Sequence, residues 1–181
     1  MGELIFIKLM TYFLENPYQE VYLRQLSKKL KVSTFATKKY ADLLIKEDLI
    51  GEERKANLRY LKPNINNLFF KQLKISLSIS KILRSGLIPF LHENVANISS
   101  IVLFGSMAKG EDDEKSDMDM VIIGKCKNLD LNKFESDIGR EINLHIFGWG
   151  EWNKQAKNNK AFYYDIIIYG IPLYGEIPVI K

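Results

Sequence analysis

The sequence predicts an α+β protein built from two domains of different character. Apolar residues recur at helical spacing through the first third of the chain, which then ends in a charged stretch typical of a hairpin. Three later apolar runs, residues 101–104, 117–123 and 141–147, have the length and composition of strands and alternate with segments of helical periodicity. We therefore expect a helical N-terminal domain and a C-terminal α/β domain with a mixed sheet.

The composition favours a soluble intracellular protein. The chain has 181 residues, of which 46% are hydrophobic, so it can bury one or two real cores. A single cysteine, Cys126, excludes a disulfide framework, and no Cys/His cluster has zinc spacing. The N-terminus lacks the pattern of a signal peptide, and no apolar run reaches the ~20 residues of a membrane span. We expect a cytoplasmic protein without a membrane partner.

The positive charge is unevenly distributed along the chain. The net charge is +4, and residues 1–62 hold 12 Lys and Arg against 8 Asp and Glu. Residues 63–181 hold 14 of each class, so the whole excess lies in the first third. This asymmetry points mildly to an anionic partner for the N-terminal domain.

The first sixty residues predict three helices and a hairpin. Residues 3–15 form a largely apolar helix that ends before a proline, and residues 22–30 form a second, short helix. A third helix begins after Ser33, a plausible N-cap, and continues to about Asp48. Residues 49–61 then read as a two-stranded hairpin with a charged tip.

This order of elements resembles a winged helix-turn-helix domain, which we place at residues 1–64. The resemblance rests on Leu23, Leu26, Leu30, Val32 and Ser33 around the turn and on Leu49-Ile50-Gly51 before the wing. It implies that the helix after the turn enters the major groove of duplex DNA and that the wing touches the backbone or the minor groove. The implied DNA-binding residues are Thr34, Lys38, Lys39, Arg54 and Lys55. Two other uses of this surface stay open, because basic residues often only solubilise a helix and winged helices also bind proteins.

Residues 65–95 are predicted to be helical linkers. The segment 66–84 carries apolar residues over a surface too wide for one small domain to cover. We expect this helix to bridge the domains or to pair with its copy in a homodimer. Gly86 ends it, and residues 89–95 form a shorter helix before the C-terminal domain, residues 96–181.

A Gly-Ser turn and two acids give the C-terminal domain its chemistry. Gly105 allows the backbone to approach a phosphate closely, and Ser106 offers a hydroxyl and an amide at the start of a helix. Asp117 and Asp119 are separated by one residue at the start of a strand, so both project from one face and can share a cation. Together these residues predict a site for a nucleotide and its metal ion.

The same pattern resembles the minimal nucleotidyltransferases of the polymerase β superfamily. Gly105, Ser106, Asp117 and Asp119 match that motif in order, and Lys109 and Ser116 fit the intervening loop. The resemblance implies a Mg²⁺-dependent enzyme that transfers a nucleoside monophosphate, AMP from ATP, to an acceptor hydroxyl. In this reading Gly105, Ser106, Lys109 and Ser116 bind the nucleoside triphosphate, and the two aspartates hold the metal.

The third carboxylate that the resemblance implies is the weak point of the pattern. Asn143 stands on the next strand where many relatives would place an aspartate. Glu141 shares a face with Asn143 by alternation, so we assign it as the third catalytic and metal-binding residue. The alternative is that this acid is missing. Asn143 alone would then leave catalysis weak, because an amide can ligate Mg²⁺ but cannot take a proton at neutral pH. His145, two residues further on, is more often a packed residue than a base.

Four further expectations complete the C-terminal domain. Residues 129–140 have helical periodicity, and residues 151–175 predict one or two helices followed by a short strand. The acidic run 111–114 is expected to face water. The aromatic and aliphatic residues of the last helical segment are expected to pack inward: Tyr163, Tyr164, Ile166, Ile167, Ile168 and Tyr169.

The resemblance implies two classes of acceptor, small molecules and a tyrosine on a protein partner such as a HEPN-type toxin. The second class suits a DNA-binding domain, because antitoxins often regulate their own transcription. The rival hypothesis is a transcriptional regulator without catalytic activity, in which the nucleotidyltransferase fold senses a nucleotide or holds a partner protein.

Overall fold

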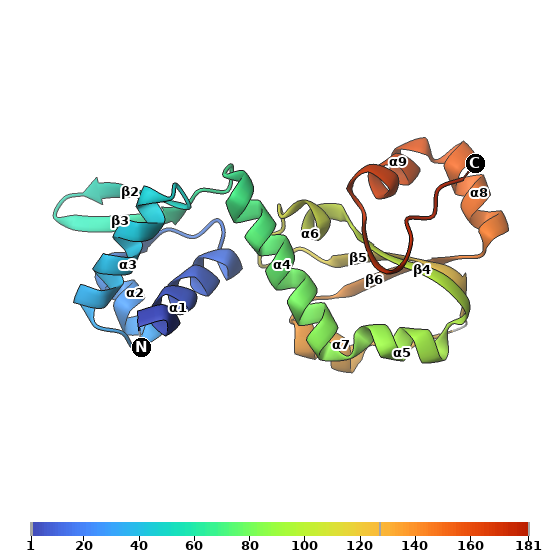
Figure 1. Ribbon diagram of the computed structural model, residues 1–181, viewed down its shortest axis with the longest axis horizontal. Helices are drawn as coiled ribbons and strands as arrows, with labels where there is room; N and C mark the ends of the chain where they lie inside the picture. The colour runs from blue at the N-terminus through green and yellow to red at the C-terminus, as the bar shows by residue number, and fades with distance from the viewer. Residues whose placement is uncertain (1, 127, 181) are drawn as a thin grey trace. The chain divides into compact units, whose positions relative to one another are not determined.

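The computed structural model describes residues 2–126 and 128–180. The chain divides into two compact units, Met1–Lys74 and Ile75–Lys181, and the boundary falls inside helix α4 (Leu68–Ser85). This boundary lies within the segment that the sequence predicts as a linker (Figure 1). Within the described residues, no helix combines the length and apolar character that crossing a membrane requires.

The described part of unit 1 contains three complete helices, a three-stranded sheet and the first turns of α4. In chain order its elements are α1 (Gly2–Glu15), β1 (Val21–Tyr22), α2 (Leu23–Leu30), α3 (Thr34–Lys46), β2 (Ile50–Lys55) and β3 (Leu58–Pro63). The helices and the hairpin lie close to their predicted positions. The two-residue strand β1 was not predicted, because so short a segment carries no alternation of its own.

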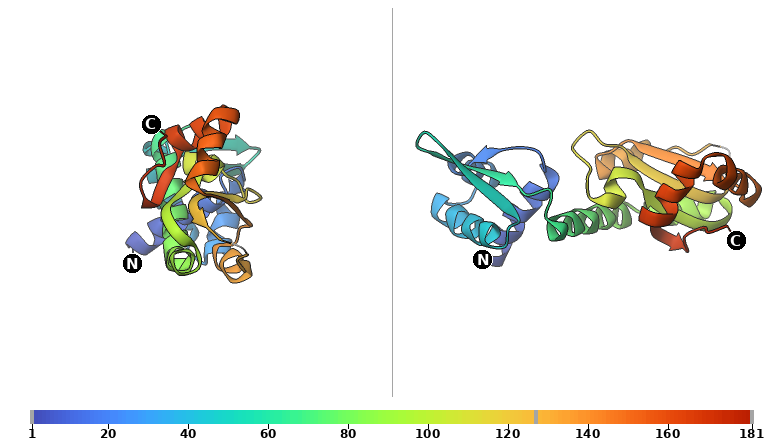
Figure 2. Two further views of the ribbon diagram at one scale, coloured as in Figure 1. Left: turned by 90° about the vertical axis from the view of Figure 1, so that its right-hand side faces the viewer. Right: turned by 90° about the horizontal axis from the view of Figure 1, so that it is seen from above.

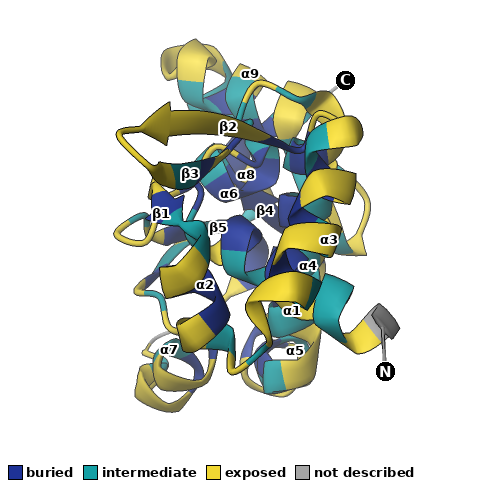
Figure 3. Ribbon diagram, turned by 90° about the vertical axis from the view of Figure 1, so that its left-hand side faces the viewer, coloured by how far each residue is buried: buried dark blue, intermediate teal, exposed yellow. Residues whose placement is uncertain are grey.

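The hairpin packs onto the helices through one edge and leaves its tip in solvent. Strands are ordered β1-β3-β2 and all pairs are antiparallel. Leu9, Leu26, Leu44 and Leu61 are among the fully buried side chains that join α1, α2, α3 and β3. Along β2 only the first residue is buried, and Figure 3 shows the rest of this strand exposed. The unit therefore presents the hairpin as a projecting, solvated arm.

Two local interactions fix the third helix and its relation to the hairpin. Ser33 caps α3, because its Oγ accepts a hydrogen bond of 3.2 Å from Ala36 N. Arg59 on β3 reaches back to α3, where its Nη2 lies 2.5 Å from Asp42 Oδ1, and its Nε donates to Glu52. The guanidinium thus ties the hairpin to the helix that precedes it.

Unit 2 begins in the second half of α4 and forms an α/β domain. Its further elements are α5 (Leu87–Asn94), β4 (Ala96–Phe104), α6 (Gly105–Lys109), β5 (Met118–Lys125), α7 (Asn132–Ile138), β6 (Ile142–Phe147), α8 (Trp149–Asn158), α9 (Lys160–Tyr169) and β7 (Ile171–Gly175). The sheet has the order β6-β5-β4-β7. Because β5 and β6 are parallel whereas the other pairs are antiparallel, the sheet is mixed, as predicted.

Alternation along the strands gives the sheet of unit 2 two apolar faces. One face carries Leu103, Met120 and Ile122 and packs against α5, α7 and the end of α4. The other carries Val121 and packs against α8 and α9 through residues such as Trp152. Figures 1 and 2 show these helices as separate layers on opposite sides of the sheet. Asp117 and Asp119 have the parity of Val121, so they belong to the face that α8 and α9 cover.

Two expectations about burial in this unit are wrong. Within α9, Tyr163 and Ile166 are buried as predicted, but Tyr164, Ile168 and Tyr169 are more than half exposed. The helix has only one side against the sheet, so a run of apolar residues cannot all point inward. In the acidic run 111–114, Asp112 is buried rather than solvated, because its carboxylate forms an ion pair with Arg140.

Candidate active site

The Gly-Ser turn at the end of β4 brings the backbone against Asp119. Gly105 has φ of +75°, a conformation that costs little only for glycine, and α6 begins at this residue. A Cβ atom placed on Gly105 would lie 2.6 Å from Asp119 Oδ2, well inside van der Waals contact. Glycine is therefore required twice, for the turn and for the space that the carboxylate occupies.

Asp117 and Asp119 lie at the start of the central strand β5. Asp119 pairs with Phe104, the last residue of β4, and Asp117 immediately precedes β5. Asp119 is half-buried and Asp117 is exposed, so one carboxylate is fixed by packing while the other faces solvent. The two aspartates and the glycine turn thus lie together at one end of the two central strands, β4 and β5.

Asn143 joins this pair from the neighbouring strand. It is the register partner of Asp119 across the parallel β5 and β6 pair. Its Nδ2 donates to Asp117 Oδ2 at 3.3 Å and to Asp119 Oδ1 at 3.4 Å. The amide therefore lies between the two carboxylates, at the position where the sequence pattern led us to look for a third acid.

Glu141 contributes backbone rather than side chain to the contacts of this region. Its carbonyl oxygen accepts a hydrogen bond of 2.8 Å from Met118 N, and its side chain is exposed. Among residues 2–126 and 128–180, no three His, Cys, Asp or Glu side chains are grouped to hold a metal ion. The role of Glu141 as a third ligand stays a prediction.

His145 is the next residue on the same face of β6. Its imidazole is exposed and lies 5.6 Å from the ring of Phe104 and 5.5 Å from that of Phe162, centroid to centroid. These contacts fit a histidine that packs at the rim of an aromatic cluster, rather than a catalytic base.

Lys109, predicted to contact phosphates, is held by α9. Its Nζ lies 2.5 Å from Asp165 Oδ1 and 4.9 Å from the centre of the Tyr169 ring. Both side chains of the ion pair are about 30% exposed. The interaction fastens the end of α6 to α9, and Asp165 is a neighbour that no motif in the sequence indicated. Ser106, at the start of α6, is half-buried, and its carbonyl accepts from Glu111 N at 2.9 Å.

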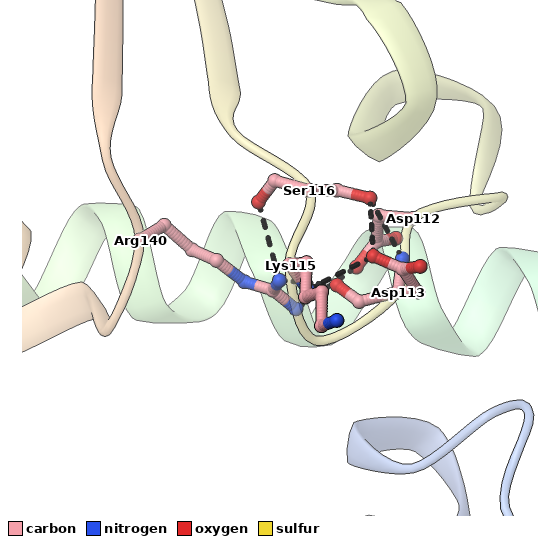
Figure 4. A network of polar contacts seen from close by, with 5 residues as sticks. All are labelled: Asp112, Asp113, Lys115, Ser116 and Arg140. Carbon is pink, nitrogen blue, oxygen red and sulfur yellow. Dashed lines mark hydrogen bonds and ion pairs between the residues drawn. The ribbon is translucent and has the colours of Figure 1, made fainter.

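Ser116 organises the loop before Asp117. Its Oγ donates to Asp113 Oδ1 and accepts from Asp113 N, both at 2.9 Å (Figure 4). The backbone N–H of Lys115 and the Ser116 hydroxyl hold the pKa of the Asp113 carboxyl below its ordinary value, because both donate to its charged form. Arg140 closes the network by donating to Asp112 Oδ2 and to the carbonyls of Asp113 and Ser116.

The residues predicted to bind DNA lie in unit 1. Thr34, Lys38 and Lys39 are exposed on α3, and Thr34 Oγ1 lies 3.3 Å from Ser27 Oγ. Arg54 and Lys55 are exposed at the tip of the hairpin.

Lys55 is already engaged by carboxylates. Its Nζ lies 2.7 Å from Glu20 Oε2 and 3.4 Å from Glu53 Oε2. The hydrogen bond to Glu20 raises the pKa of the ammonium above its ordinary value. Part of the charge of the hairpin tip is therefore neutralised within the unit.

Comparison with known proteins gives a family match in the C-terminal half of the chain. The family model described as "Polymerase beta, Nucleotidyltransferase" matches residues 86–176, just over half of the 181 residues. No curated protein matches the chain. A solved structure described as "Crystal structure of the toxin-antitoxin with AMP-PNP" is 20% identical, covering 54% of this chain and 73% of that chain with a TM-score of 0.37. The matched residues include the glycine turn, the two aspartates and Asn143, and the chain belongs to the polymerase beta nucleotidyltransferase family.

Proposed function

We propose that unit 2 binds a Mg²⁺ nucleoside triphosphate and transfers its nucleoside monophosphate, AMP from ATP, to an acceptor hydroxyl. The observation that carries this proposal is the packing of the Asp119 carboxylate against Gly105 beside Asp117. It joins the residues suited to phosphate and to a divalent cation at one point. Membership of a nucleotidyltransferase family supports the same class of reaction.

The donor set fits a Mg²⁺ ion that arrives with its nucleotide. Mg²⁺ in such sites is bound by one or two carboxylates together with substrate phosphates, rather than by a cage of protein ligands alone. Asp117 and Asp119 supply the two carboxylates, so a third protein ligand is not needed for one ion. When bound, Mg²⁺ would neutralise charge on the phosphate oxygens as pyrophosphate leaves.

Residues of this chain would bind the phosphates and accept the proton of the acceptor hydroxyl. Gly105 admits the triphosphate close to the backbone, and Ser106 offers its hydroxyl and amide. The acceptor oxygen forms a bond to the α-phosphorus while the bond from that phosphorus to pyrophosphate breaks. The proton of the acceptor hydroxyl passes to Glu141 or to water, because the Asn143 amide cannot accept it at neutral pH.

Unit 1 is proposed to be a winged helix-turn-helix domain that binds duplex DNA. The basic, exposed residues of α3 and the projecting hairpin support this reading, and Phe35 on α3 is 81% exposed. A protein with both activities would suit an antitoxin that controls its own transcription. Its acceptor would then be a tyrosine of a partner such as a HEPN-type toxin, and a small-molecule hydroxyl is the alternative.

One observation favours a second function, that of a regulator that binds a nucleotide without transferring it. Asn143 donates hydrogen bonds to both carboxylates and stands where a third acid would hold a second metal. An amide at this position would weaken catalysis and leave triphosphate binding intact. Both functions therefore require the nucleoside triphosphate to be bound, and they differ in whether its nucleoside monophosphate is transferred.

Calorimetry and a pyrophosphate assay separate these functions. We expect wild type to bind Mg²⁺·ATP and the double variant Asp117→Asn/Asp119→Asn to lose that binding. Transfer by the enzyme would release pyrophosphate from ATP in the presence of an acceptor, and Glu141→Gln should abolish release while sparing binding. In a regulator, wild type would bind without turnover, and Asn143→Asp should restore some pyrophosphate release. Equal affinity of wild type and the double variant would end both readings.

A further inference from the structure

Arg140 makes an unusual set of contacts for a residue with no role in the sequence motif. Its side chain is only 17% exposed, and its partner Asp112 is 6% exposed. The guanidinium donates to Asp112 Oδ2 at 3.4 Å, to the Ser116 carbonyl at 3.2 Å and to the Asp113 carbonyl. Figure 4 shows the side chain of Arg140 directed at the loop that carries Asp112 to Ser116.

These contacts bracket Asp117 from both sides. On its N-terminal side the Ser116 carbonyl is held by Arg140, and on its C-terminal side Met118 N donates to the Glu141 carbonyl at 2.8 Å. Arg140 and Glu141 are consecutive, so one short segment at the start of β6 fixes the main chain before and after Asp117. The carboxylate itself is met from the same strand by Asn143 Nδ2 at 3.3 Å.

We propose that Arg140 is a positioning residue that presents Asp117 to the cation of the bound nucleotide, an inference that rests on the proposed function. Asp117 precedes the strand and is exposed, so β5 alone does not fix it against the like charge of Asp119. The loop before it also carries four consecutive acids, residues 111–114, whose mutual repulsion favours an expanded loop. The guanidinium opposes both tendencies by pinning the carbonyls next to Asp117.

The geometry also explains why arginine, rather than lysine, suits this position. The planar fork of a guanidinium can donate to a carboxylate and to carbonyls at the same time, whereas an ammonium is a compact point charge. A lysine would keep the positive charge near the acids and lose the simultaneous contacts with Asp112, Asp113 and Ser116. The substitution Arg140→Lys therefore separates charge from positioning.

The test measures Mn²⁺ affinity by electron paramagnetic resonance, with a nonhydrolysable ATP analogue present. Residues that orient metal ligands typically contribute 10- to 100-fold to metal affinity. We expect Arg140→Gln to weaken Mn²⁺ binding by about that factor and Arg140→Lys to recover little of it. Amide hydrogen exchange should become faster for Ser116 to Met118 in both variants while the rest of the sheet stays protected.

The matched control is Glu135→Ala, which removes another support of the same strand. The Glu135 Oε1 atom accepts a hydrogen bond of 3.0 Å from Ile142 N, and within the described residues its side chain makes no hydrogen bond or ion pair with the loop before Asp117. Glu135→Ala should lower the thermal midpoint and leave Mn²⁺ affinity within about twofold of wild type. Wild-type affinity in Arg140→Lys, or equal losses in Arg140→Gln and Glu135→Ala, would overturn the positioning role. A wild type that binds neither Mn²⁺ nor the analogue would instead refute the proposed function, and the inference with it.

Discussion

Replacing Gly105 by alanine tests whether the glycine turn shapes the metal site as well as the backbone. An added Cβ would lie 2.6 Å from Asp119 Oδ2, whereas ordinary contact begins at 3.4 Å. The carboxylate oxygen must therefore retreat by about 0.8 Å, the difference between these two distances. Functional metal sites keep ligand distances to about ±0.2 Å, so this displacement is several times the tolerance. We expect Gly105→Ala to lower Mg²⁺·ATP affinity by at least about tenfold.

Gly86→Ala is the control that isolates this effect. Gly86 has φ of +78°, close to the +75° of Gly105, but nothing lies within 4 Å of the Cβ that alanine would add. Both variants should lose about 1–2 kcal/mol of unfolding free energy because alanine is strained in the left-handed region. Only Gly105→Ala should also lose nucleotide affinity, since only its methyl group displaces a carboxylate.

Calorimetric titration with Mg²⁺·ATP and urea denaturation supply the two readouts. We expect the two variants to show similar stability losses and different affinities. If Gly105→Ala bound Mg²⁺·ATP as wild type does, the contact with Asp119 would have no bearing on the site. If Gly86→Ala lost affinity to the same extent, backbone strain rather than the displaced carboxylate would explain the result.

Charged side chains in each unit can be tested by substitution and titration. Lys38→Ala with Lys39→Ala should reduce the salt slope of log DNA affinity by about 1.8, because each phosphate contact contributes about 0.9. Lys55→Ala should reduce it less, since Glu20 and Glu53 already share that ammonium, and an unchanged slope in the double variant would exclude α3 as the contact surface. In unit 2, the Asp113 carboxyl should titrate below its ordinary pKa of 3.8 in a carboxyl-carbon NMR experiment. Its contribution to stability should be present above 3.8 and be lost as the pH falls through the lower native pKa, whereas Ser116→Ala should move the midpoint back up.

Where the signal is local, the sequence predicted which residues lie together at the glycine turn. Gly105, Asp117 and Asp119 are recognisable because each carries a constraint that its immediate neighbours reveal: a turn, and two acids that alternation places on one face. Parallel pairing of β5 and β6 then brings Asn143 beside them, on the strand where the family resemblance implied a third carboxylate. The helices of unit 1 were also predictable, because the apolar periodicity of each helix, and the Ser33 cap of α3, lie within the segment itself.

The missed features depend on pairs of residues far apart in the sequence. Asp112 is buried because Arg140 reaches it across 28 residues, and nothing near either residue signals the other. The sequence around Lys109 predicts an unpaired cation in a polar loop. In the structure its Nζ lies 2.5 Å from the Oδ1 atom of Asp165, which is 56 residues later on α9. In α9 the composition showed an apolar helix, but only the fold decides which of its faces meets the sheet. Long-range pairing of this kind is set by topology rather than by local pattern.

The placement of the acids on β5 has a consequence for the energetics of ligand binding. This strand is hydrogen-bonded to β4 on one side and to β6 on the other, so it cannot open without the loss of both ladders. Amides in such central strands usually exchange only through global unfolding, whereas ends and short helices fray locally. A nucleotide whose cation rests on Asp119 would thus be linked to the cooperative unfolding of unit 2. Ligand binding should therefore raise the unfolding free energy of the whole unit by RT ln(1 + [L]/Kd), and the midpoint of thermal unfolding should rise with ligand concentration.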